Sequence, residues 1–170
     1  HGACNDLQAA TFRPRKPARI RLLASRNGRL AIEIAPAPVS ATQPLRVALA
    51  PLPVASSDFR LRHKTSDRAF YDDARRASSA DEVVFVDADG CLTEGSFTNV
   101  FVERDGVLLT PPLARGLLPG VLRAELIDSG RAVEHDLAAD DLAASFFLGN
   151  ALRGLFPARV AVAKAGSGSL

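Results

Sequence analysis

The stretch from Glu82 to Pro112, EVVFVDADGCLTEGSFTNVFVERDGVLLTPP, decides the predicted fold. Its pattern indicates consecutive strands, which we expect at residues 82–87, 98–103 and 107–110. Asp89-Gly90 and Asp105-Gly106 mark turns in this stretch. Asp-Gly between β-branched and aromatic residues is a strong hairpin signal, because Gly tolerates the positive φ that tight turns require. The stretch therefore predicts a β-meander in the middle of the chain.

A small, polar segment, TEGSFTN at residues 93–99, interrupts these strands. It contains a single carboxylate, Glu94, set among residues that favour strands. A simple meander needs no such interruption. We therefore take Glu94 as a candidate site residue.

The composition excludes several classes of protein. The 170 residues are 47% hydrophobic and 24% charged, as is ordinary for a soluble globular domain, and the net charge of +2 gives no basic footprint for nucleic acid. The basic residues between Arg13 and Arg21 are interleaved with prolines and lack an aromatic platform, so we expect a solvated, irregular segment.

The cysteines and histidines give no sign of a metal centre. Cys4 and Cys91 form neither a disulfide framework nor a metal cluster, and the three histidines lack ligand spacing. No apolar run is long enough to cross a membrane and no signal peptide is visible. We therefore predict a cytoplasmic protein without a metal. Because the chain starts at His1 and contains no Met, we also expect it to be a piece of a longer protein.

The rest of the chain predicts an α+β class, with hairpins followed by alternating helices and strands. A two-residue turn at Asn27-Gly28 is expected to join strands 19–24 and 29–35. Further elements are expected as follows: a helix tail at 7–12, a strand at 45–50, a helix from a Thr65 or Ser66 cap to about Ala77, a helix at 121–129 ended by Gly130, a strand at 132–136, a short helix at 137–144, a strand at 146–148, a turn at 150–156 and a strand at 159–163.

Lys64 is the second candidate site residue. It ends a loop of high charge density that also contains Arg60, Arg62 and His63. Cationic neighbours disfavour the charged form of an ammonium group, and neutral amines are nucleophiles. The alternative is that Lys64 is one more surface lysine.

A lysine nucleophile and a lone carboxylate in a sheet suggest a pyridoxal phosphate site. That cofactor needs a lysine to hold it as a Schiff base, an acid facing its pyridine nitrogen, and a phosphate cup of backbone N–H groups. Gly120 precedes a predicted helix and Gly149 precedes a predicted turn, so either could supply the cup. The alternative for each glycine is an ordinary helix or turn boundary.

Five segments, in order along the chain, resemble the class IV aminotransferase family of fold type IV pyridoxal phosphate enzymes. They are Lys64-Thr65-Ser66-Asp67-Arg68, the run TEGSFTNVF from Thr93 to Phe101, Leu109-Thr110-Pro111-Pro112, Gly120-Val121-Leu122-Arg123 and Asn150-Ala151-Leu152. The resemblance covers about residues 45 to 163 and implies that Lys64 holds pyridoxal 5′-phosphate. It also implies that Glu94 meets the pyridine nitrogen, and that Gly120, Val121, Leu122, Asn150 and Ala151 hold the phosphate.

The resemblance further implies a fold and a domain division. The expected fold is the C-terminal lobe of a fold type IV enzyme, an antiparallel or mixed sheet or barrel with flanking helices, preceded by a remnant hairpin of the N-terminal lobe. The expected divisions are the remnant at 1–36, a linker at 37–44, the cofactor-binding lobe at 45–165 and a flexible tail at 166–170. Family members have a larger N-terminal lobe with a phosphate-binding arginine, and they form dimers.

Within the family, the Asn150-Ala151-Leu152 turn resembles 4-amino-4-deoxychorismate lyases, whereas branched-chain and D-amino acid aminotransferases usually carry a Thr- or Ser-rich turn. The RHKTSDRAFYDDAR run resembles the lyase half of fused aminodeoxychorismate synthase–lyase proteins. The resemblance implies conversion of 4-amino-4-deoxychorismate to 4-aminobenzoate and pyruvate in folate biosynthesis. A transaminase, or a non-catalytic domain without the N-terminal lobe, is the alternative.

Overall fold

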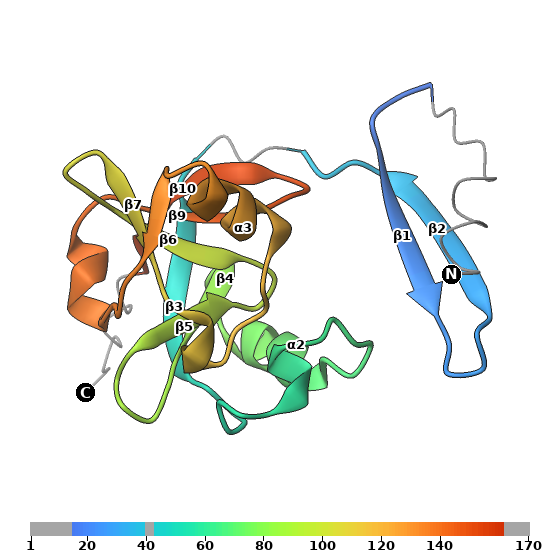
Figure 1. Cartoon of the computed structure of the whole chain (residues 1–170), viewed down its shortest axis with the longest axis horizontal. Helices are drawn as coiled ribbons and strands as arrows, with labels where there is room; N and C mark the ends of the chain where they lie inside the picture. Colours follow the sequence, from blue (N-terminus) through green and yellow to red (C-terminus); the bar gives the residue numbers. More distant parts are fainter. Residues whose placement is uncertain (1–14, 40–42, 162–170) are drawn as a thin grey trace, which may run out of the picture. The chain divides into compact units, whose positions relative to one another are not determined.

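The computed structural model describes residues 15–39 and 43–161, and the chain forms two compact units that divide between residues 40 and 41 (Figure 1). The expected helix tail at 7–12, Cys4 and the tail from residue 166 lie outside the described residues.

The first unit is an antiparallel hairpin of β1 (Ala18–Ala24) and β2 (Leu30–Pro36). The predicted two-residue turn is wrong, because Ala24 pairs with Leu30 and five residues separate the strands. The N–H of Ser25 donates to the carbonyl of Arg29 at 2.9 Å, and Gly28 has a φ of +80°. This is the longer type of hairpin loop, in which a glycine near its end adopts the left-handed conformation.

The second unit contains a mixed sheet in the order β5-β4-β3-β10-β9-β6-β7-β8 (Figure 1). Its strands are β3 (Leu45–Pro51), β4 (Glu82–Val86), β5 (Leu92–Gly95), β6 (Asn99–Arg104), β7 (Val107–Thr110), β8 (Ala132–Glu134), β9 (Phe146–Asn150) and β10 (Gly154–Val160). An additional pairing between β5 and β6 closes six of these strands into a ring, from which β7 and β8 extend. The predicted mixed sheet or barrel is confirmed.

The strands at the centre of this unit are buried on both faces. Val84 of β4 belongs to the main apolar core, whereas Val83 and Phe85 pack on the opposite side with Leu61. On β6, Phe101 turns to a third cluster with Leu126. Successive side chains of a strand point to opposite faces, so near-continuous apolar runs require cover on both sides.

Two α-helices provide that cover: α2 (Ala69–Ala77) packs against β4, and α3 (Val121–Asp128) packs against β9 (Figure 1). The predicted helix ending at Gly130 is confirmed, with Gly130 at a φ of +72°. The predicted start of α2 is wrong, because Arg68 is its N-cap residue. The predicted apolar face is wrong in part: Ala69 and Ala77 are exposed, and Tyr71 is the buried residue.

Three other expectations need correction. Residues 92–95 form strand β5 instead of an interruption between strands, because β5 pairs with both β4 and β6. The turn expected at 150–156 is shorter, since β10 already begins at Gly154. The helix expected at 137–144 is a 3-10 helix, η3 (Ala139–Ala143). Two more 3-10 helices, η1 (Phe59–Leu61) and η2 (Leu113–Arg115), lie in connections.

Candidate active site

Glu94 lies on β5, where it pairs with Asn99 of β6, and its side chain is only 3% exposed. The hydroxyl of Tyr71 on α2 donates a hydrogen bond to its Oε1. The backbone N–H of Leu118, in the connection before α3, donates to its Oε2 at 3.1 Å. Glu94 is therefore a buried carboxylate held by donors from two distant parts of the chain.

Burial raises the pKa of Glu94 to about 7, because a carboxylate loses hydration when it is taken out of water. The hydrogen bonds from Tyr71 and Leu118 lower that pKa, as do the positive charges of Arg68 and Lys64. Near neutral pH the group therefore sits close to its own titration point. Such a displaced pKa is common at functional sites.

Lys64 lies in the loop between η1 and α2 and is exposed. Its positive charge is among those that lower the pKa of Glu94, after that of Arg68. Arg60, which was expected to be one of the cationic neighbours of Lys64, instead forms ion pairs with Asp58 at 2.8 Å and with Asp67 at 3.1 Å. Arg60 is therefore largely neutralised and contributes little repulsion to Lys64.

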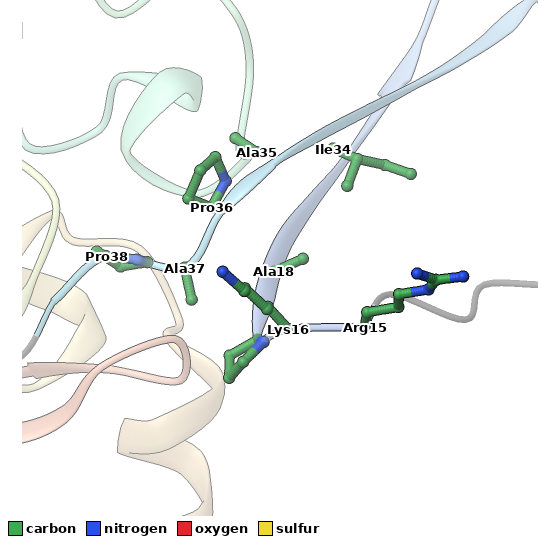
Figure 2. A pocket seen from close by; sticks show the side chains of 9 residues that line it. Arg15, Lys16, Ala18, Ile34, Ala35, Pro36, Ala37 and Pro38 are labelled. Carbon is green, nitrogen blue, oxygen red and sulfur yellow. The ribbon is translucent and has the colours of Figure 1, made fainter.

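Lys16 is a less suitable candidate to hold the cofactor. It lines a pocket of the first unit with Arg15, Ile34 and a group of alanines and prolines (Figure 2). None of the residues that line this pocket is a carboxylate. Lys16 therefore lacks there the acid partner that a pyridine nitrogen requires.

Tyr71 and Arg68 belong to the site although the sequence did not single them out. The guanidinium carbon of Arg68 lies 4.2 Å from the centre of the Tyr71 ring. Nη2 of Arg68 donates to the carbonyl of Ser96 at 3.1 Å, whereas its Nη1 is buried without a hydrogen-bond partner among the described residues. The available signals were that both residues lie in the RHKTSDRAFYDDAR run and that Tyr71 is the single tyrosine of the chain.

The two glycine turns expected to hold a phosphate lie beside one another. Asn99 pairs with Gly149 at the end of β9, and its Nδ2 donates to the carbonyl of Leu118 at 3.2 Å. A Cβ on Gly120 would overlap Oδ1 of Asn99, and a Cβ on Gly149 would come within 2.8 Å of the Leu122 side chain. Asn99 and Leu122 thus join the start of α3 to the end of β9.

The start of α3 and the turn at Asn150 differ in their hydrogen bonding. No side chain caps α3 at Gly120, so the N–H groups of Val121 and Leu122 have no acceptor within the helix. Asn150 shapes its own turn: its Oδ1 accepts from the N–H of Leu152 at 3.1 Å, and its Nδ2 donates to the carbonyl of Phe97 at 3.1 Å. Phosphate binding by Gly120, Val121, Leu122, Asn150 and Ala151 stays a prediction.

Arg123 follows these residues on α3 but serves another purpose. Its Nη2 donates to the carbonyl of Pro111 at 2.8 Å and pairs with Glu134. Arg123 is 4% exposed and ties α3 to the sheet. Among the residues that the structure describes, no cluster of three metal-ligating side chains occurs. No described helix is long and apolar enough to span a membrane.

A closed ring of strands, with a buried acid on one strand and a helix that no side chain caps, agrees with the expected fold type IV lobe. The chain belongs to the amino-transferase class IV family, whose model matches residues 3–161. The cofactor of this family is pyridoxal 5′-phosphate. The resemblance found in the sequence is confirmed.

Three known proteins show how this chain relates to others. A Mesorhizobium loti protein of known crystal structure, named a putative amino-acid aminotransferase, is 43% identical with a TM-score of 0.81, covering 94% of this chain and 78% of that one. A protein of Schizosaccharomyces pombe, assigned as an aminodeoxychorismate lyase, is 30% identical over 125 residues, 70% of this chain and 54% of that protein. A branched-chain-amino-acid aminotransferase of Thermotoga maritima, assigned as probable, is 38% identical over 53 residues, 31% of this chain.

The match spans about half the length of the Schizosaccharomyces pombe protein and 19% of the Thermotoga maritima protein. These relatives carry two different activities in their names. The family match identifies the family and its cofactor, whereas the names of the relatives do not identify one reaction.

Proposed function

We propose that this chain is the cofactor-binding lobe of a 4-amino-4-deoxychorismate lyase, which forms 4-aminobenzoate and pyruvate. The observation that carries the proposal is the buried carboxylate of Glu94, on which the positive charges of Arg68 and Lys64 act. The Asn150 turn favours the lyase over a transaminase, and the Schizosaccharomyces pombe relative supports it.

The described residues fit the cofactor. A carboxylate has about four acceptor positions, and Glu94 uses one on each oxygen for Tyr71 and Leu118. It therefore retains acceptor capacity for a pyridinium N–H. The first-turn N–H groups of α3 lack acceptors within the helix, and helix N-termini favour phosphate.

Each residue has a distinct task in the proposed reaction. When bound, pyridoxal phosphate supplies an electron sink for a carbanion. Lys64 holds the cofactor and, once displaced by the substrate amine, takes the proton from the amine-bearing ring carbon. The charge of Glu94 keeps the pyridine nitrogen protonated. Loss of the proton and of the enolpyruvyl group leaves an aromatic ring, and Lys64 returns the proton to the departing group.

A transaminase is the second candidate, because the Mesorhizobium loti and Thermotoga maritima proteins carry aminotransferase names. In that reaction Lys64 moves the proton to the cofactor instead of to a leaving group. The complete protein given 4-amino-4-deoxychorismate should release pyruvate without needing a 2-oxo acid. Transfer of an amino group to a 2-oxo acid, with no pyruvate released, would select the transaminase.

Lys64 can be tested with this chain alone. It has three lysines, Lys16, Lys64 and Lys164. Mixed with pyridoxal phosphate, it should show the visible band of a lysine-bound cofactor, which borohydride abolishes. Mass spectrometry of the reduced protein should place the adduct on Lys64, and Lys64→Ala should abolish the band while Lys16→Ala and Lys164→Ala keep it. A band unchanged in Lys64→Ala would refute the assignment.

The phosphate cup can be tested by deleting one N–H group. Proline is tolerated at the first position of a helix, and Gly120 has the extended conformation that a residue before proline prefers. Val121→Pro should weaken pyridoxal phosphate about tenfold, the effect of losing one charge-assisted hydrogen bond, and leave the affinity for pyridoxal unchanged. Leu113→Pro, at the first position of η2 after the extended Pro112, is the matched control. Equal losses in the two variants would refute the cup.

A cytoplasmic location, a homodimer and a further N-terminal lobe in the complete protein are also part of the proposal. They rest on the family resemblance. Size-exclusion chromatography of the complete protein with light scattering measures the dimer directly.

A further inference from the structure

The ring of Tyr71 is fixed by aromatic packing that directs its hydroxyl toward Glu94. The ring is 1% exposed and is packed between Phe70, with ring centres 4.2 Å apart, and the edge of Phe85, with centres 5.3 Å apart. The hydroxyl at the end of this ring donates to Oε1 of Glu94. The hydrogen bond is thus set by the packing of α2 on β4, before any ligand binds.

Tyr71 acts as a donor and not as a base. Burial and the neighbouring Glu94 carboxylate raise the pKa of Tyr71 well above its usual range, so the phenol keeps its proton. Arg68 lies over the face of the ring, and its Nη2 is held by the carbonyl of Ser96. A cation over a phenol ring draws electron density from it and favours hydrogen-bond donation by the hydroxyl.

We infer that Tyr71, supported by Arg68, is a positioning residue that orients the Glu94 carboxylate and favours its ionised form. The role in catalysis rests on the proposed function, in which Glu94 faces the pyridine nitrogen. The Tyr71–Glu94 interaction itself is a property of the chain without cofactor. Leu118 holds the second carboxylate oxygen, so the two donors together fix the plane of the group.

The ionised state needs this support. A buried carboxylate without donors takes up a proton, and a protonated Glu94 cannot stabilise a pyridinium. The charged or titratable groups that act on Glu94 are Tyr71 on α2, Arg68 at the N-cap of α2 and Lys64 in the preceding loop. Glu82, on the neighbouring strand β4, is directed instead to Ser96 and Thr98.

The chain offers a direct measurement. It contains six glutamates, so carboxyl-¹³C glutamate labelling gives six signals, and Glu94→Gln identifies that of Glu94. Tyr71→Phe keeps the ring and removes the hydroxyl, and should raise the pKa of Glu94 by about one unit or more. Phe85→Leu loosens the same packing without removing a donor and should shift that pKa much less. Arg68→Met should raise the pKa of Glu94, and Arg68→Lys should give a value between those of the wild type and Arg68→Met.

A second arm avoids mutation. Because Tyr71 is the single tyrosine, growth on 3-fluorotyrosine changes this residue alone. Its phenol is more acidic and a stronger donor, so the pKa of Glu94 should fall, opposite to Tyr71→Phe. An unchanged Glu94 pKa in both forms, or an equal rise in Phe85→Leu, would overturn the inference. Should Tyr71→Phe not fold, the fluorinated chain decides alone. The proposed function would be refuted by a different result, an unchanged cofactor spectrum in Lys64→Ala.

Discussion

Glu82 and Glu94 are two buried carboxylates on adjacent strands, and they serve different purposes. Burial raises the pKa of both. Oε1 of Glu82 accepts from the N–H groups of Val83 at 2.8 Å and Ser96 at 3.0 Å, and its Oε2 accepts from the Thr98 hydroxyl at 3.4 Å. All these donors lie on its own strand or in the turn between β5 and β6. Glu82 therefore holds that turn in place.

Glu94 is bound by groups that the fold brings from far away in the sequence. Tyr71 precedes it on α2, Leu118 follows it before α3, and the charges of Arg68 and Lys64 act on it. Burial and a displaced pKa thus do not distinguish the two carboxylates. What distinguishes them is the kind of partner: the donors to Glu82 lie on its own strand or in one turn, whereas Glu94 is held by two separate elements and is also acted on by cations.

The largest difference between substitutions of Glu94 and of Glu82 should appear in the turnover of the complete protein. Glu94→Gln keeps the size of the side chain and removes its charge, so the cofactor should still bind while the rate falls about a hundredfold. That corresponds to about 3 kcal/mol, the scale of losing one preorganised electrostatic partner. Glu82→Gln is the matched control and should change the rate less than about fivefold. Wild-type turnover in Glu94→Gln would show that its charge has no electronic role.

When stability is measured instead of turnover, substitution of Glu82 should have a larger effect than substitution of Glu94. Glu82→Ala leaves the N–H of Val83 and the Thr98 hydroxyl without the carboxylate that accepts from them, whereas the N–H of Ser96 keeps the carbonyl of Val83 at 3.0 Å. Each group that loses its acceptor costs about 1–3 kcal/mol, so the free energy of unfolding should fall by about 2 kcal/mol or more. Urea denaturation of the chain without cofactor measures it. A loss in Glu82→Ala no greater than that of an exposed control, Glu103→Ala, would contradict the structural role.

Much of the sheet was predictable because local patterns determine it. Asp105-Gly106 gave the right hairpin, and both residues adopt positive φ as such a turn requires. TEGSFTN identified Glu94 because a carboxylate among strand-forming residues is unusual. That Thr93–Gly95 is itself a strand was not predictable locally, since β5 is held by β4 on one edge and β6 on the other.

The partners of Glu94 could not be predicted for a related reason. Tyr71 looks like an ordinary apolar residue of α2, and only the packing of α2 on β4 brings its hydroxyl to the acid. Leu118 contributes through its backbone N–H, so its side chain carries no signal. Glu82 looked like the first residue of a strand, and its burial follows from the closure of the ring.

The pH dependence of stability should also separate the two acids. The folded-state pKa of Glu94, about 7, lies above the ordinary value near 4.5. Between these values the folded chain keeps a proton that the unfolded chain has lost, so the free energy of unfolding falls as pH rises. The fall should be about 3 kcal/mol, complete above pH 7. Glu94→Gln should remove that part of the slope and keep the part that Glu82 contributes. An identical slope in wild type and Glu94→Gln, from denaturation at pH 4.5 to 8, would contradict the raised pKa.

The smallest predicted effect tests how closely the turn is built around Glu82. A Cβ on Gly95 would overlap Oγ1 of Thr98 and lie 3.3 Å from the Glu82 carboxylate. Gly95→Ala should therefore cost about 1–2 kcal/mol, the range for a buried side chain forced to move. Thr98→Ala removes the atom that the new Cβ meets, at the cost of one hydrogen bond to Glu82. The double variant should be more stable than the sum of the two losses by about 1 kcal/mol, because the overlap no longer exists. Urea denaturation of the four proteins gives this coupling energy directly, and the Glu94 carboxyl signal should titrate near its wild-type pKa in the double variant. Strictly additive losses would show that Gly95 is not required by the close approach of Thr98.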